Sequence, residues 1–136
     1  MIRFTTDSAE MPSLDIPRIS LWLQEVAAGY NKQIGHLNYI FCNDERILEV
    51  NRQFLGHDYY TDIITFDYSC FPVISGDIFI SLDTVRSNAG QENVSFDEEL
   101  HRILVHGLLH LTGQGDKTPD TKAEMTAKEN EALAKL

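Results

Sequence analysis

The spacing of apolar residues along the chain predicts a set of helices. Between Pro17 and Asn31, hydrophobic side chains recur every three or four residues, as on one face of a helix. Pro17 suits the first turn of that helix, because its missing N–H has no partner there anyway. Similar patterns and capping residues predict four more helices, from Asn43 or Asp44 to about Phe54, from Asp83 to near Gly90, from Phe96 to Thr112, and from Thr118 onward.

Short segments rich in β-branched and aromatic residues predict strands between these helices. They are MIRFTT at the start, Leu37 to Phe41, ITFDYSCF and GDIFIS, and the last two are expected to pair as a hairpin. Strands and helices mix without strict alternation. We therefore predict an α/β class fold, an α+β sandwich in which a small mixed sheet of about four strands packs with about five helices.

The bulk composition is that of one soluble globular domain. The chain has 136 residues, of which 43% are hydrophobic and 24% charged, so we expect a single domain spanning residues 1–136. No segment approaches the roughly 18 uninterrupted apolar residues of a membrane helix, and the start shows no secretory signal. The expected location is the cytoplasm, with no membrane partner.

Cys42 and Cys70 lie in apolar stretches without a Cys-x-x-Cys spacing and are interpreted as reduced core residues.

The net charge restricts the ways in which this chain could bind nucleic acid. The formal charge is −10, from 21 acidic and 11 basic side chains. Such an excess of acid argues against broad electrostatic capture of nucleic acid or of an anionic membrane. A nucleic-acid substrate would need a local basic patch, a bound metal or a partner protein.

The segment HGLLHLTGQGD carries the strongest chemical signal. His106 and His110 are four residues apart, so on a helix they project from the same side and can share one metal ion. Gly113 follows where a helix that ends and reverses favours glycine, and Gly115 loosens the turn further. Asp116 can then swing back toward the imidazoles. Three protein ligands leave a position open for water, which predicts one divalent metal ion, with zinc expected, and hydrolytic chemistry.

Angular positions on the predicted helix place these histidines outside its core stripe. The core stripe consists of four leucines within roughly 80° of one another at 100° per residue, namely Leu100, Leu104, Leu108 and Leu111. His106 and His110 fall beside Ile103 and Glu99. Glu99 is about 10 Å along the helix from His106 at 1.5 Å per residue, too far to be a ligand, and a solvent-exposed position is expected for it.

The same pattern has alternative interpretations. The histidines could be ordinary polar residues on a helix, with Gly113 as a plain C-cap and Asp116 capping the next helix. The spacing also matches the extended zinc motif of metzincin proteases, but Gly107 stands where those proteases place their general-base Glu. A protease would therefore lack its proton acceptor.

A second polar cluster precedes the predicted ITFDYSCF strand. His57, Thr61 and Asp62, with Asp58 between them, could line a cleft and bind substrate, or they could simply form a turn. His36 and His101 have no partner nearby in the sequence and are interpreted as structural.

Together, these residues resemble the YbeY family of endoribonucleases, the rRNA maturation factors. The family signature is His-Gly-x-Leu-His-Leu-x-Gly-x-x-His, and its matching positions here are His106, Gly107, Leu109, His110, Leu111 and Gly113. The second family motif has counterparts at Asn51, Phe54, Asp58, Thr61, Asp62, Phe66 and Gly76-Asp77-Ile78. The resemblance covers roughly residues 44–130.

The resemblance implies a single zinc site in an α/β fold, at the end of a cleft, and single-strand-specific cleavage of RNA. It also implies rRNA and the small ribosomal subunit as partners, in maturation of the 3′ end of small-subunit rRNA and in ribosome quality control, and no DNA. Two positions depart from the pattern. Asp116 aligns with the third metal-binding His, and Leu55 aligns with an Arg expected to meet phosphate. Either His57, Arg52 or another basic side chain replaces that Arg, or this chain binds RNA differently.

Three hypotheses of function follow. The first is a metal-dependent endoribonuclease whose catalytic base is not identified by the sequence. The second is a metallohydrolase of peptide or amide bonds, suggested by the metzincin-like spacing. The third is a non-catalytic ribosome-associated factor in which the metal is structural.

Overall fold

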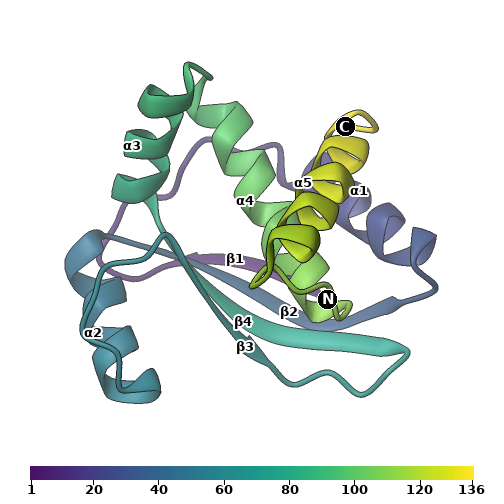
Figure 1. Cartoon of the computed structure of the whole chain (residues 1–136), viewed down its shortest axis with the longest axis horizontal. Helices are drawn as coiled ribbons and strands as arrows, with labels where there is room; N and C mark the ends of the chain where they lie inside the picture. The colour runs from purple at the N-terminus through teal and green to yellow at the C-terminus, as the bar shows by residue number, and fades with distance from the viewer.

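Four strands and five helices make up the fold of this chain, and the computed structural model describes all 136 residues (Figure 1). In chain order they are β1 (Ile2–Thr6), α1 (Ile16–Gly29), β2 (Gln33–Cys42), α2 (Asp44–Leu55), β3 (Ile63–Asp67), β4 (Val73–Ser81), α3 (Leu82–Glu92), α4 (Phe96–Leu111) and α5 (Pro119–Leu133). The predicted numbers of strands and helices, and their order, are confirmed.

The strands form one mixed sheet in the order β1-β2-β4-β3. β1 and β4 each pair in parallel with β2, whereas β3 pairs antiparallel with β4 as the predicted hairpin. Side chains alternate between the two faces of a strand. Tyr39, Phe41 and Ile78 therefore point into the large core formed with α1, α3, α4 and α5, while Cys42 and Ile64 pack with α2 in a small second core. Figure 1 shows α2 set apart from the other helices.

Helix α4 is central to the large core and carries the expected apolar stripe. Leu100, Leu104, Leu108 and Leu111 are fully buried, as the angular positions predicted. The hydroxyl of Tyr39 in β2 donates a hydrogen bond of 2.7 Å to the carbonyl of Leu104, which ties the helix to the sheet beneath it. The face of α4 that bears the histidines is thereby held in a fixed orientation.

None of the five helices combines the length and the hydropathy that a membrane crossing needs.

Several details of the sequence prediction were wrong. Cys42 is buried, but Cys70 is exposed because β3 ends at Asp67 and the chain turns through Cys70 to pair with Val73. The third helix is capped by Ser81, whose hydroxyl accepts from the Thr84 amide, and not by Asp83. Glu99 was expected in solvent, yet it is only 6% exposed.

Candidate metal centre

Helix α4 presents two histidines side by side at its C-terminal end. Its start is fixed by Ser95, whose hydroxyl accepts a hydrogen bond from the Glu98 amide, and by acidic side chains in the first turn, which suit the positive end of the helix dipole. The imidazole centroids of His106 and His110 are 4.7 Å apart and their planes cross at 82°. Both side chains are partly buried, with 21% and 28% exposed.

The loop after α4 brings Asp116 back to these imidazoles. Gly113 has φ of 104°, a left-handed conformation that favours glycine, and it reverses the chain. Gln114 is buried, and its side-chain amide donates to the carbonyl of Gly115, which holds the loop in place. One carboxylate oxygen of Asp116 lies 3.5 Å from Nε2 of His106 and 3.3 Å from Nε2 of His110.

These three donors lie close enough together to share one metal ion. All three ligand atoms lie within 4.8 Å of one another. For a tetrahedral zinc with bonds of about 2.0–2.1 Å, neighbouring ligand atoms are separated by about 3.3 Å, close to the two distances measured from Asp116. The residues present therefore fit a divalent cation, and His106, His110 and Asp116 could hold one.

Glu129 of α5 supports the first of these ligands. Its carboxylate lies 2.6 Å from Nδ1 of His106, and it also accepts a hydrogen bond of 2.8 Å from Arg102. The hydrogen bonds from His106 and Arg102 outweigh burial and lower the pKa of Glu129, so its carboxylate is the acceptor and Nδ1 of His106 the donor. This pairing leaves Nε2 of His106 free to face the metal, an arrangement common among metal-bound histidines.

The two imidazoles respond differently to their surroundings. Burial alone would lower the pKa of His106, but the hydrogen bond and charge of Glu129, with Asp116, raise it above its ordinary value. Burial and the neighbouring His106 lower the pKa of His110, which favours the neutral form that binds metals.

Glu129 was missed by the sequence analysis. It is one of several glutamates in a polar helix, and no local pattern distinguishes it.

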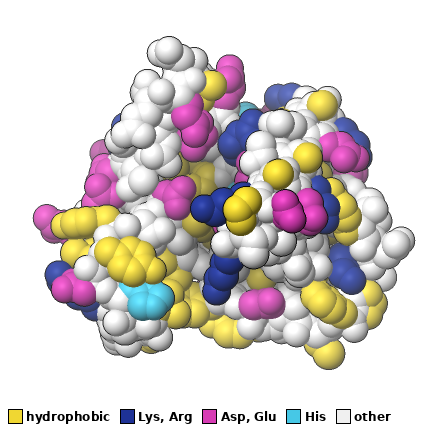
Figure 2. Space-filling model, in the orientation of Figure 1, with side chains coloured by type: hydrophobic (Ala, Val, Ile, Leu, Met, Phe, Trp, Pro, Cys, Tyr) yellow, Lys and Arg dark blue, Asp and Glu magenta, His cyan; other side chains and the backbone are white.

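The metal ligands open into a cavity of about 740 Å³. Thr61 and Asp62 line it together with Tyr59 and Lys117, so of the two alternatives left open by the sequence, a cleft or a plain turn, these residues form part of a cavity wall. Burial raises the pKa of Asp62. The ring of His57 stacks on Tyr59 at a centroid distance of 5.1 Å, but His57 does not itself line the cavity. Figure 2 shows one face of the molecule, which is hollowed near its centre, with Lys and Arg side chains along one side of the hollow.

Gly107 faces the sheet, where Ile78 and Ile63 pack against it. A Cβ atom at this position would lie 2.9 Å from Cδ1 of Ile78 and 3.2 Å from Cδ1 of Ile63, closer than ordinary contacts. The absence of a side chain lets α4 approach β3 and β4 closely. A glutamate at position 107 would be directed into the sheet, so the general base of a metzincin-like protease has no place on this helix.

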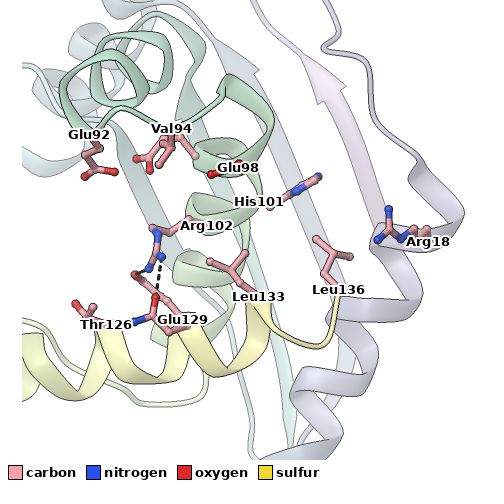
Figure 3. Close-up of a pocket in the computed structure, with 12 residues that line it drawn as sticks. Arg18, Glu92, Val94, Glu98, His101, Arg102, Thr126, Glu129, Leu133 and Leu136 are labelled. Carbon is pink, nitrogen blue, oxygen red and sulfur yellow. Dashed lines mark hydrogen bonds and ion pairs between the residues drawn. The ribbon is translucent and has the colours of Figure 1, made fainter.

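A second cavity, of about 800 Å³, lies along α4 and α5 (Figure 3). It is lined by Glu92, Glu98, Glu99 and Glu129, with Arg102 held by Glu129. Oε1 of Glu99 is buried without a hydrogen-bond partner. Burial and the neighbouring Glu92 raise the pKa of Glu99 to about 7.

The fold and the candidate metal centre define a class of protein: an α+β protein in which a His-His-Asp group that could hold a metal ion lines an open cavity. The family model described as Endoribonuclease YbeY matches residues 5–136. The chain belongs to the YbeY family, as its motifs suggested.

Individual relatives agree with this assignment over nearly their whole length. The chain is 56% identical to "Endoribonuclease YbeY" of Phocaeicola vulgatus over 134 residues, covering 98% of this chain and 97% of the relative. It is 52% identical to the protein of the same name from Bacteroides thetaiotaomicron, covering 98% and 97%. A solution structure of TM1509 from Thermotoga maritima superposes with a TM-score of 0.68 at 26% identity, covering 99% of this chain and 91% of that one.

Proposed function

We propose that this protein is a metal-dependent endoribonuclease that cleaves single-stranded RNA. Its proposed substrate is rRNA of the small ribosomal subunit, near the 3′ end, with a role in ribosome quality control in the cytoplasm. We also propose that residues 1–136 act as a single domain. Family membership supports RNA as the substrate class. The observation that carries the proposal is that His106, His110 and Asp116 lie together in the wall of an open cavity.

One divalent metal ion, proposed to be zinc, would be held by these three side chains. A bound metal of this kind stabilises charge that develops on phosphate oxygens and lowers the pKa of water. Asp116 is an oxygen ligand where the family pattern has histidine, which makes the site harder and widens its choice toward manganese or nickel.

The protein's own groups orient the site and shape access to it. Glu129 retains the proton on Nδ1 of His106 and fixes the orientation of that imidazole. Thr61 and Asp62 line the cavity next to the ligands and are proposed to bind substrate. His57 is proposed to contact substrate through the aromatic surface that it forms with Tyr59.

The alternative functions receive less support. A metallohydrolase of peptide or amide bonds would need a proton acceptor, and Gly107 excludes the one that metzincin-like spacing would supply. A non-catalytic ribosome-associated factor with a structural metal does not need the open cavity beside the ligands. Neither alternative is favoured by the family assignment.

The proposal is tested by measuring metal content and RNA cleavage on the same purified sample. We expect about one metal ion per chain and cleavage of single-stranded RNA that stops on addition of a chelator, with casein left intact. The double variant His106→Ala/His110→Ala should lose both metal and cleavage. His36→Ala, a histidine outside the metal cavity, is the matched control and should keep both. Equal metal content in wild type and the double variant would refute the site, and cleavage of casein would favour the amide hydrolase.

A further inference from the structure

The charged side chains around the metal cavity are almost all acidic. Asp62, Asp67 and Asp116 line it, and Lys117 is the one lysine or arginine among its lining residues. RNA is a polyanion, and the whole chain carries a formal charge of −10. Binding of RNA here therefore requires a local positive charge in addition to the metal. Lys117 is the side chain placed to supply it.

The other basic side chains near the centre are paired elsewhere. Arg52 forms an ion pair with Asp58. Arg102 donates to Glu129 at 2.8 Å and to Asn130 at 2.7 Å. Neither arginine lines the metal cavity.

Lys117, in contrast, is exposed and free of ion pairs, and its backbone is held between two fixed points. Asp116 precedes it at the metal centre, and Thr118 follows as the N-cap of α5. The amides of Thr118 and Thr121 are both used in the capping box, and Pro119 has no N–H. The end of α5 therefore has few amides free for a phosphate, which leaves the Lys117 ammonium as the available donor.

Acidic side chains also line a second cavity at His106, which Lys117 does not line. This cavity, of about 160 Å³, is lined by His106, Asp62, Glu92 and Glu99, and it shares Glu92 and Glu99 with the larger cavity of Figure 3. The only lysine or arginine of that small cavity is Arg102, already bound to Glu129. A polyanion therefore approaches the metal more favourably from the side of Lys117.

Building on the proposed function, we propose that Lys117 binds a backbone phosphate of the RNA beside the metal centre and so sets the side from which the strand enters. Lysine acts on phosphate as a mobile point charge, and a phosphate contact positions the strand without reading its sequence. Removal of the contact is therefore expected to weaken binding of different RNA sequences by the same factor.

The test compares Lys117→Met with Lys117→Arg and with Lys122→Met, which removes the same charge from an exposed position on α5 outside the metal cavity. KM and kcat are measured on single-stranded RNA with metal-loaded protein. Binding is measured separately by fluorescence anisotropy on a single-stranded 2′-O-methyl oligoribonucleotide, which has the phosphates of RNA but lacks the free 2′-hydroxyl.

For Lys117→Met we expect about a tenfold loss in kcat/KM, mainly through KM, and a similar loss in oligonucleotide affinity, as for one hydrogen bond to a charged group. The slope of log affinity against log salt should become shallower by about 0.7, the value for one phosphate contact on a single strand. Lys117→Arg should retain most of both properties, and Lys122→Met should match wild type.

Two results would overturn the inference. One is that Lys117→Met and Lys122→Met behave alike in affinity and salt slope. The other is that Lys117→Met loses metal, which would mean that it acts through the Asp116 loop. Failure of wild-type protein to cleave RNA would instead count against the proposed function, because the oligonucleotide measurement still tests Lys117.

Discussion

The contact between Glu129 and His106 makes a quantitative prediction about metal affinity. Replacing Glu129 by Gln keeps the size of the side chain but removes its charge. The carboxylate accepts from Nδ1 of His106 at 2.6 Å and from Arg102 at 2.8 Å, and the residue is only 7% exposed. An amide has one oxygen to accept with, so its NH₂ group must then face one of these two donors.

The expected loss follows from the strength of these bonds. Hydrogen bonds to a charged group contribute about 1.5–3 kcal/mol, against about 0.5–1.5 kcal/mol between neutral groups. A difference of about 1.4 kcal/mol corresponds to a factor of ten in affinity. Together with the repelling NH₂ group, this gives a metal affinity about 10- to 100-fold weaker for Glu129→Gln, the range found for outer partners of metal-bound histidines.

The assay is competition for zinc against a chromophoric chelator at fixed pH. Glu131→Gln is the matched control, because Glu131 lies two residues along α5, is exposed and forms its ion pair with Lys135, away from His106. Its zinc affinity should equal that of wild type. Equal zinc affinities for the Glu129→Gln and Glu131→Gln variants would refute the idea that this carboxylate supports the metal ligand.

Three further predictions concern the ligand loop and the packing of α4. Asp116→Asn should lower zinc content well below one ion per chain on metal analysis, and an unchanged content would show that the loop contributes no ligand. Gly107→Ala should destabilise the fold by about 1 kcal/mol in urea unfolding, because overpacking costs about 1–3 kcal/mol while the higher helix propensity of alanine offsets up to about 1 kcal/mol of that cost. Gly90→Ala in α3 is the control. No atom lies within 4 Å of its added Cβ, so this variant should be more stable than wild type. Glu99→Gln should have a higher free energy of unfolding than wild type, and the difference should grow as pH rises from about 4.5 to about 7 and then become constant. Burial and Glu92 raise the folded-state pKa of Glu99, so ionisation of Glu99 opposes folding. Urea unfolding at pH 5 and pH 8 checks this, and a difference independent of pH would contradict it.

The part of the site that lies in one continuous segment was predictable from the sequence. The histidine spacing fixes a shared helix face, and the glycine at position 113 allows the reversal that brings Asp116 back. The four buried leucines of α4 likewise follow from angular position alone.

Contacts between distant segments were not predictable in this way. Glu129 reaches His106 from a separate helix, 23 residues later in the chain. Glu99 was assigned to solvent because helical angles give the face on which a residue lies but not what covers that face. In the structure, Glu92 at the end of α3 and Asp62 lie around Glu99. The error at Cys70 arose because an apolar run can continue past the last paired residue of a strand.

The close approach of α4 to the sheet at Gly107 also limits how this site can evolve. A glutamate there would need room that Ile78 and Ile63 occupy, so the helix would have to withdraw from the sheet and carry both histidines with it. One substitution therefore cannot turn this metal centre into a protease of the metzincin kind. A stepwise change from this site to a metzincin-like protease would include variants whose two histidines no longer lie in position to bind a metal, although the two sequence motifs differ at only a few positions.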